Sequence, residues 1–452
     1  MQPSGVCGRV IGMRKSGLAI VAGCVCLCVA GGMQTMAQIK RTSVPLGNAV
    51  GVALAKGSLT GEGARPFHIR VTVSEPENPR SPYQGTIEEW WASPEQFRLE
   101  ATAKGGMRQT VVMAAGKKTE KDEGEYFPLW LRMFLNAVNE PIPNAQAWAA
   151  SGGTIDQVTM PDGRKSDACV RAQSKLGTGE RATDAFTVVC FDGDGRLKSY
   201  VSPGYDMDFG DFRGFGKKQV ARVLSNDPEP GTALIGKVEV LEELKGATDT
   251  LFAPLLTNDD RFRSAHVGSE QMERMIAGNP AIDWPPVHSG NTKGKLAVYV
   301  ATDADGNVRE AWPLNSDNAG LEDPARAQVM KWKLGPAVDK DGHRLQVDGG
   351  IGFAFETKIG DPLPQLSNAE VRALATHAVE PEWPSSGLTK GQAIRIDVSV
   401  NEKGEMTGYG MGSVPPAAAA GVMKAISQWK FKPLIRDGKA QYFHGTIEFL
   451  VN

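Results

Sequence analysis

Few residues of this chain combine the types and spacing that catalysis needs. The sequence contains six histidines, and no two of them stand four residues apart, as a zinc site on one helix requires. No Gly-x-Ser-x-Gly elbow occurs, and the Gly-Lys-Lys-Thr segment at 116–119 lacks the upstream glycine of a phosphate-binding loop. The Asp-Gly-Asp-Gly turn at 192–195 lacks the distal glutamate of a calcium loop. We therefore predict a protein that is not an enzyme and that holds no metal or cofactor.

The first 37 residues have the layout of a cleavable signal peptide. Three basic residues precede an apolar run at 16–32, and a Thr-Met-Ala segment then leads to Gln38. This pattern predicts export to the periplasm or secretion, with cleavage between Ala37 and Gln38. The apolar run is at or below the shortest length that spans a bilayer, so an inner-membrane anchor at 16–32 is the alternative. Lipidation of Cys24 is a third option, although the apolar run continues past the lipoprotein-like box at 21–24.

Removal of the signal peptide would leave two cysteines, Cys169 and Cys190, of the six in the full sequence. A loop containing Gly177 and Gly179 separates them, so a hairpin would make them neighbours on adjacent strands. In an oxidising compartment this pair predicts a structural disulfide. Two free, buried thiols are the alternative.

The charge of the mature chain argues against nucleic acid as a partner. Cleavage after Ala37 removes three basic residues and no acidic ones, which leaves 47 Lys and Arg against 52 Asp and Glu, or a formal charge of −5. A nucleic-acid-binding domain would instead carry clustered positive charge. The remaining length predicts two or three domains, each with its own core.

The C-terminal part of the sequence repeats itself. A Trp-Pro pair begins at 284 and again at 383, a turn glycine stands at 306 and 404, and a Trp-Lys-x-x-Pro segment ends at 336 and 433. The offsets are 99, 98 and 97, so the landmarks keep their order and nearly their spacing. In each copy, two strands with alternating apolar and polar residues are joined by a Gly turn. A helix with one apolar stripe follows them, and a closing strand ends the copy. This order predicts a helix packed on a small antiparallel sheet.

The repeated pattern resembles the C-terminal domain of the TonB family. The second copy matches at Trp429, Phe431, Pro433, Gly438 and Lys439. The first copy is looser, because a leucine replaces the phenylalanine and a Gly-Gly pair at 349–350 interrupts its last strand.

The resemblance implies binding of an extended protein segment, such as that of an outer-membrane receptor, by strand addition. We expect the partner-binding edge strand to comprise Thr446, Ile447, Glu448, Phe449 and Leu450. An equally weighted alternative is that the other repeat covers this strand. The chain lacks the long Pro-rich spacer of an energy transducer, so docking in envelope transport fits better than force transmission.

The larger N-terminal part reads as a meander of strands with one apolar helix at 128–135. With the segments Gly-Thr-Ile-Glu at 85–88 and Trp-Ala-Ser-Pro-Glu-Gln-Phe-Arg at 91–98, this part resembles the half-barrel of the LolA/LolB lipoprotein carriers. That resemblance implies an apolar concavity lined by Trp90, Phe97, Trp130 and Phe134, which could hold an acyl chain. The alternative is that these aromatic residues fill the core.

Together these features predict an α+β fold: a curved antiparallel sheet with a covering helix, followed by two small domains of a helix on an antiparallel sheet. The expected function is that of a non-catalytic periplasmic TonB-family protein that binds partner proteins; the alternative is a carrier of lipid or lipoprotein. The expected divisions are a signal peptide at 1–37, a β-rich domain at 38–255, a linker at 256–279, a first repeat at 280–358, a linker at 359–378 and a second repeat at 379–452.

Overall fold

The computed structural model describes residues 39–451, except for 77, 79, 161, 228–232, 247–249, 277–280, 361, 385 and 412–413. The predicted signal peptide, its cleavage site at Ala37 and Gln38, Cys24 and the alternative anchor at 16–32 all lie outside the described residues. Among the helices of the described part, none is both long and apolar enough to cross a membrane.

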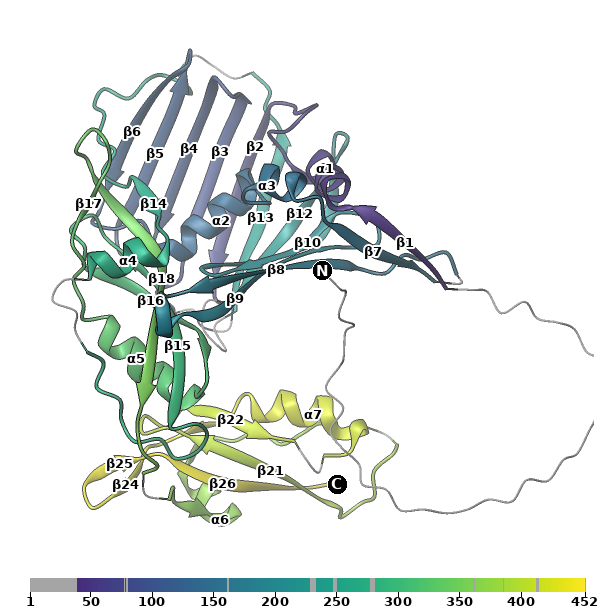
Figure 1. Ribbon diagram of the computed structural model, residues 1–452. Helices are drawn as coiled ribbons and strands as arrows, with labels where there is room; N and C mark the ends of the chain where they lie inside the picture. Colours follow the sequence, from purple (N-terminus) through teal and green to yellow (C-terminus); the bar gives the residue numbers. More distant parts are fainter. Residues whose placement is uncertain are drawn as a thin grey trace, which may run out of the picture.

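One antiparallel sheet of eleven strands dominates the molecule and curves around a helix, α2 (Leu129–Asn139) (Figure 1). Its strands follow the spatial order β6-β5-β4-β3-β2-β13-β12-β11-β10-β9-β8. Their bounds are β2 (Phe67–Ser74), β3 (Gly85–Ser93), β4 (Gln96–Ala103), β5 (Met107–Ala114), β6 (Lys117–Glu123), β8 (Ala168–Leu176), β9 (Thr183–Phe191), β10 (Leu197–Ser202), β11 (Tyr205–Phe215), β12 (Lys218–Asn226) and β13 (Leu234–Glu243).

The sequence of β2 shows why these residues form a sheet with one buried face. Phe67, Ile69, Val71 and Val73 are buried, while the residues between them are partly or fully exposed. This period of two is what a pleated strand produces when only one face lies against a core. The buried face of the sheet points toward α2, so the main core lies in the hollow of the sheet.

Two glycines let α2 approach the sheet closely. A Cβ atom added at Gly236 of β13 would lie 2.8 Å from the ring of Phe134, and one added at Gly85 of β3 would lie 3.0 Å from Trp130. The contact at Gly236 is shorter than real Cβ contacts, and at Gly85 the added Cβ would also lie 2.7 Å from the carbonyl oxygen of Thr102, so neither position has room for a side chain. Trp130 and Phe134 therefore occupy the space above these glycines and fix the helix on the sheet.

A small ribbon and two further helices complete the N-terminal half. The ribbon pairs β1 (Lys40–Pro45) with β7 (Thr154–Thr159) and extends away from the body of the molecule (Figure 1). Helix α1 (Leu46–Gly57) buries Leu46, Ala49, Val50 and Ala53. This spacing places them on one helix face. Helix α3 (Ala145–Ala150) contacts α1.

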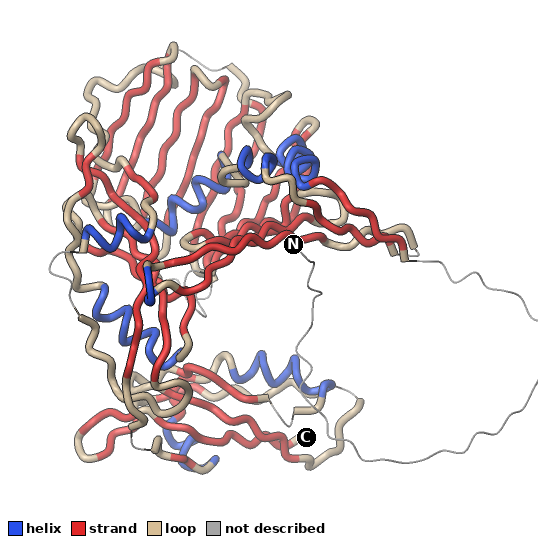
Figure 2. The backbone as a smooth tube through the Cα atoms, viewed as in Figure 1, coloured by secondary structure: helices blue, strands red, loops and turns tan. Residues whose placement is uncertain are grey.

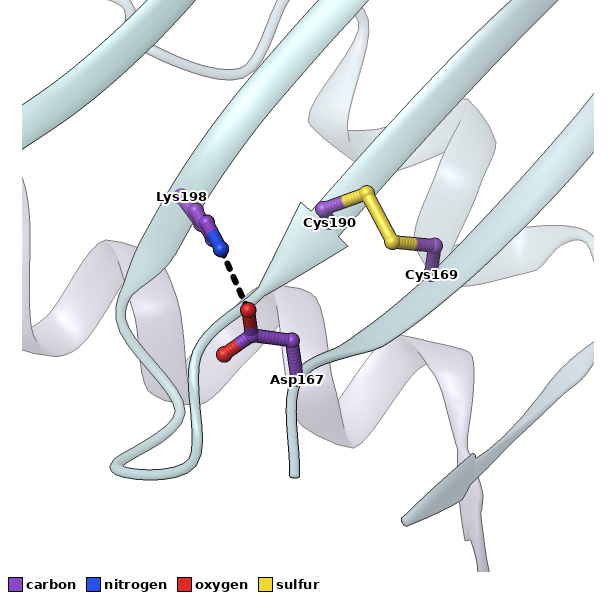
Figure 3. The surroundings of a disulfide bond; sticks show 4 residues. All are labelled: Asp167, Cys169, Cys190 and Lys198. Atoms are coloured by element: carbon purple, nitrogen blue, oxygen red, sulfur yellow. Dashed lines mark hydrogen bonds and ion pairs between the residues drawn. A yellow bond between two sulfur atoms is a disulfide. The ribbon is translucent and has the colours of Figure 1, made fainter. Parts of the chain in front are cut away.

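The predicted disulfide is confirmed. Cys169 of β8 lies directly opposite Cys190 of β9, and their sulfur atoms are bonded (Figure 3). Asp167 and Lys198 form an ion pair beside the disulfide (Figure 3). Because β8 is the outermost strand of the large sheet, the bond fastens an edge strand that has a partner in the sheet on one side only.

A first small sheet packs against the large one. It has the order β14-β18-β15-β16, with β17 paired to β18. Tyr299, Ala301 and Trp312 of this sheet belong to the same hydrophobic core as the large sheet. The elements of this part are β14 (Ser264–His266), α4 (Ser269–Met275), β15 (Lys293–Thr302), β16 (Val308–Ser316), α5 (Glu322–Val329), β17 (Ala337–Val338) and β18 (Arg344–Glu356).

A second small sheet, of order β19-β26-β21-β22, follows the same plan. In both small sheets a short strand lies parallel to the closing strand, which in turn pairs with the first strand of a hairpin. The second sheet has a core of its own, which includes Val422, Trp429 and Phe449. Its elements are β19 (Gln365–Leu366), α6 (Asn368–Leu374), β20 (Ala375–His377), β21 (Ala393–Val400), β22 (Met406–Gly410), α7 (Pro416–Ile426), β23 (Lys430–Phe431), β24 (Leu434–Arg436), β25 (Lys439–Gln441) and β26 (Phe443–Leu450).

The predicted α+β fold class is wrong. The described residues form mainly antiparallel sheet, the eleven-stranded sheet being the largest unit, and the helices between the strands are short (Figure 2). The prediction gave the apolar stripes around Trp332 and Trp429 too much weight. Both helices end before these tryptophans, at Val329 and Ile426, so they contribute little to the architecture.

The two segments predicted as linkers contain regular structure. Residues 256–279 include β14 and α4, and residues 359–378 include β19, α6 and β20. Both segments supply the short parallel strand of the small sheet that follows them. The domain boundaries themselves stay predictions.

Candidate functional site

A cavity lies between the hollow face of the large sheet and the helices that cover it. Its empty volume is about 560 Å³, counting the part that opens to solvent. Ile69, Leu224 and Phe209 line it from three strands of the sheet, Ala53 and Leu54 line it from α1, and Ala137 and Val138 line it from the last turns of α2. The room for the centres of water-sized molecules is about 40 Å³, so the cavity as it stands could hold a few waters, and a larger ligand would have to displace the lining side chains.

The lining of this cavity is almost entirely apolar. Seventeen described residues contribute to it, and Arg196 carries the one polar side chain among them. Ile69, Ile142 and Leu224 are each no more than 3% exposed. A ligand inside would therefore meet hydrocarbon on nearly all sides, which favours an apolar ligand over a polar one.

Arg196 is the polar residue of the cavity lining. Its Nε donates to Asp192 Oδ2 at 2.7 Å, and its Nη2 lies 2.9 Å from Asp194 Oδ2. The guanidinium group also lies 4.6 Å from the centre of the Phe212 ring. The two carboxylates offset the positive charge, so this part of the lining is polar without a large net charge.

The acidic turn at 192–195 uses its oxygens within the protein. Asp192 Oδ1 accepts hydrogen bonds from the backbone N–H groups of Asp194 and Arg196, at 3.0 and 2.9 Å. A similar turn brings the side chains of Asp339, Asp341 and His343 close enough together to hold a metal ion. Asp339 Oδ1, however, accepts hydrogen bonds from the backbone N–H groups of Asp341 and His343, each at 2.9 Å. Hydrogen bonds of this kind account for the acidic residues in both turns.

The four aromatic residues predicted to line a concavity are not the residues that line this cavity. Trp130 and Phe134 fill the space between α2 and the sheet, and Phe97 packs against the main core. Trp90 lies on the opposite face of the sheet, where its ring stacks on His68 with 5.0 Å between centroids. The apolar spacing of residues 46, 49, 50 and 53 could have revealed α1, which supplies part of the true lining.

Glu89 of β3 is a buried carboxylic acid next to the cavity. It is only 3% exposed, and its neighbours across the ladder are Ile69 of β2 and Leu99 of β4. Its Oε2 has no hydrogen-bond partner among the described residues. Burial raises the pKa of Glu89 to about 7. An unsatisfied buried polar atom costs about 1–3 kcal/mol, so the fold carries an energetic burden at this position.

The raised pKa predicts how pH changes stability through Glu89. Between its ordinary pKa of 4.5 and a folded pKa of about 7, the folded state holds a proton that the unfolded state has released. Proton binding by Glu89 therefore stabilises the folded state fully below pH 4.5. As the pH rises from there toward 7, the free energy of unfolding falls by up to about 1.4 kcal/mol per pH unit. We expect Glu89→Gln to lose less stability than wild type between pH 5 and pH 7 in urea unfolding.

The neighbouring residue provides the control for this pH measurement. Glu88 points to the other face of the sheet and pairs with Arg70 at 2.7 Å and His68 at 2.8 Å. Burial works to raise the pKa of Glu88, but these partners hold it below the usual value. Glu88→Gln should therefore lose as much stability between pH 5 and pH 7 as the wild-type protein does. An identical pH dependence in wild type and Glu89→Gln would contradict the prediction.

A buried polar cluster ties the start of α2 to the first small sheet. Arg132 Nη1 lies 3.5 Å from Asp348 Oδ2, and Tyr299 donates to Asp348 Oδ1 at 2.7 Å. Glu310 Oε1 accepts from the Tyr126 hydroxyl at 2.9 Å and from the backbone N–H of Leu129, the first residue of α2, at 2.6 Å. The helix that covers the cavity is thus anchored by residues of β15, β16 and β18.

Burial acts differently on the two carboxyls of this cluster. It raises the pKa of Glu310 to about 7. It also works to raise the pKa of Asp348, but the hydrogen bond from His266, the charge of Arg132 and the hydrogen bond from Tyr299 hold that pKa below its usual value. Asp348 is therefore the carboxyl of this cluster that stays ionised at neutral pH, opposite Arg132.

The strand predicted as a partner-binding edge lies inside its sheet. Residues 446–450, Thr446, Ile447, Glu448, Phe449 and Leu450, belong to β26, which pairs with β21 on one side along its whole length. On the other side, β19 pairs with residues 444 and 445. Beyond β19, Arg372 donates to the carbonyl oxygen of Glu448 at 2.8 Å, and Asn368 accepts from its N–H at 3.0 Å. The expected open edge is thus covered by α6, while partner binding itself remains a prediction.

No family model matches the sequence, and no curated protein matches it. Two solved structures match about the same share of the chain. A LolA superfamily protein from Nitrosomonas europaea shares 8% identity, with 46% of this chain and 98% of that chain covered and a TM-score of 0.23. A domain from Vibrio parahaemolyticus, described as an outer membrane lipoprotein-sorting protein, shares 9% identity over 46% of this chain and 95% of that chain, with a TM-score of 0.22. Neither is a TonB protein, so the TonB resemblance has no support from either, and TM-scores this low assign no family to the chain.

Proposed function

We propose that this chain is a non-catalytic carrier in the cell envelope that holds the acyl chain of a lipid or lipoprotein inside the hollow of its large sheet. The observation that carries this proposal is the apolar lining of the cavity between the sheet and helices α1 and α2, in which Arg196 has the one polar side chain among the described lining residues. Each methylene group moved from water into such a site contributes about 0.8 kcal/mol. Binding of a chain of several methylenes therefore requires the lining side chains to move apart, because the open space is small.

The cavity has apolar walls and one polar lining residue. Its walls come from the sheet on one side and from α1 and the end of α2 on the other, and Arg196 is the polar residue among them. A lipid could thus insert its chain while its polar head stays near Arg196, Asp192 and Asp194. The exported location that the N-terminal segment predicts places such a carrier between membranes, where acyl chains need protection from water.

A substitution that fills the cavity tests this function. Ala221 of β12 lines the cavity beside Phe212, so Ala221→Phe would occupy space that the lipid needs. We expect the lipid that copurifies with the mature chain, measured by native mass spectrometry, to fall by roughly tenfold, the equivalent of about two methylene groups. Ala172→Phe, on the exposed surface of β8, provides a matched control that should retain the wild-type amount. A wild-type protein that binds no lipid, or an Ala221→Phe variant that binds as much as wild type, would contradict the proposal.

A further inference from the structure

The ribbon of β1 and β7 carries two exposed apolar side chains at its far end. Its strands pair over six residues each, or about 20 Å, and the outermost pair is Lys40 with Thr159 (Figure 1). Ile39 and Met160 come next in this antiparallel register, so they lie opposite each other on one face of the ribbon. Ile39 is 61% exposed and Met160 is 42% exposed. Apolar surface at such a protruding point meets only water unless a partner covers it.

The same end of the ribbon is positively charged. Its described residues, called the ribbon tip below, are 39–41, 159, 160 and 162–165. The exposed cations of the ribbon tip are Lys40, Arg41, Arg164 and Lys165. The one acid of the ribbon tip, Asp162, pairs with Arg164 at 2.6 Å, and the other three cations form no ion pair with any described residue. The predicted mature chain has a formal charge of −5, so this positive charge is a local concentration.

The ribbon tip also follows closely, along the chain, on the segment predicted to direct export. Seven residues separate Gly32, the end of the apolar run at 16–32, from Ile39. Even when fully extended, seven residues span at most about 25 Å. A signal peptide or an anchor enters a membrane through its apolar run. The ribbon tip is therefore the part of the described fold that either version of this segment would bring next to a membrane.

We propose that the ribbon tip docks on the surface of a membrane that contains anionic lipids. Ile39 and Met160 insert between the lipid head groups, and the cations around them face the lipid phosphates. Apolar side chains surrounded by positive charge fit this surface better than an uncharged one, because both terms add to the affinity. The inference does not depend on what the cavity holds.

The length of the ribbon explains how an acidic protein can dock on an anionic surface. The ribbon holds its tip about 20 Å from the body, which is roughly twice the Debye length at physiological ionic strength. Repulsion between the body and the membrane is therefore largely screened, while the cations of the ribbon tip lie at the lipid phosphates themselves.

Sedimentation of the mature chain with lipid vesicles tests the inference. One set of vesicles contains phosphatidylcholine alone, and the other contains equal parts of phosphatidylcholine and phosphatidylglycerol. We expect the wild-type protein to bind the anionic vesicles at least roughly tenfold more tightly. Lys40→Gln combined with Arg41→Gln should weaken this binding by roughly 25-fold, about fivefold for each charge. Ile39→Ser combined with Met160→Ser should weaken it by roughly tenfold, because less apolar surface leaves water.

Two matched controls lie in the second small sheet and its helix. Lys430→Gln combined with Lys432→Gln removes the same charge from exposed positions, and Ile435→Ser combined with Met423→Ser changes apolar residues that are 59% and 48% exposed. Both controls should bind like wild type, and every variant should keep the wild-type midpoint in urea, because all the changed residues are exposed.

Wild-type protein that binds neither kind of vesicle, or binds both equally, would overturn the inference. Ribbon-tip variants that bind as tightly as wild type, or controls that lose as much binding as they do, would overturn it as well. The carrier function would stand in each of these cases, since its test is the lipid that copurifies with the protein.

Discussion

Replacing Arg132 with methionine is expected to lower the free energy of unfolding by about 3–5 kcal/mol, because it removes the guanidinium opposite the buried carboxylate of Asp348 and leaves His266 as the remaining titratable partner of that carboxylate. Asp348 is 7% exposed and lies 3.5 Å from Arg132. Methionine has a similar length and keeps the packing of α2, so the loss reports the charge and not the volume. Urea unfolding at pH 7, followed by tryptophan fluorescence, measures the difference.

A double variant separates the ion pair from other effects of Arg132. In Arg132→Met combined with Asp348→Asn, the buried charge is absent, and Tyr299 can still donate to the amide oxygen. We expect this variant to recover at least half of the stability lost by Arg132→Met alone. A loss below about 1 kcal/mol in the single variant, the usual size for an exposed pair, would show that the pair is solvated.

Removing the disulfide should have the second largest effect. With Cys169 and Cys190 both changed to serine, the unfolded chain regains the freedom of a loop whose ends are 21 residues apart. The expected loss is about 3 kcal/mol in the free energy of unfolding. Urea titrations of the wild type with and without dithiothreitol should show the same loss, whereas reductant should not change the midpoint of the double variant. A wild type that is insensitive to reductant and to the double substitution would contradict the prediction.

Local sequence predicted the elements whose core faces are apolar. Alternation at Phe67, Ile69 and Val71 predicted β2, and an apolar segment at 128–135 predicted α2, which extends to Asn139. Strand β6 was missed because its sequence, Lys-Lys-Thr-Glu-Lys-Asp-Glu, has no apolar alternation. Its buried residues include Glu120 and Asp122, and Gln109 of the neighbouring strand donates to both, at 2.7 and 3.1 Å. The buried carboxyls of β6 thus depend on Gln109 of β5, which the sequence of β6 alone does not reveal.

The cavity could not be predicted, because its shape depends on how eleven strands curve and on where α1 lies against them. Glu89 was within reach of sequence reasoning, since Ile87, Glu89 and Trp91 share one face of a strand. The adjacent pair Glu88-Glu89 reads as two solvated charges until the register of β3 shows that one of them is buried. The fold class failed for a different reason: the apolar stripes that lead to Trp332 and Trp429 were given too much weight, and both helices end earlier, at Val329 and Ile426.

The two copies of the repeat differ in their independence. Tyr299, Ala301 and Trp312 of the first copy complete the core of the large sheet, and Arg132 and Glu310 join the two across a shared seam. The second copy closes its own core with Val422, Trp429 and other residues from 366 to 451. Substitutions in the first copy are therefore constrained by the core of the large sheet as well as by its own, whereas those in the core of the second copy are constrained by residues of that copy itself.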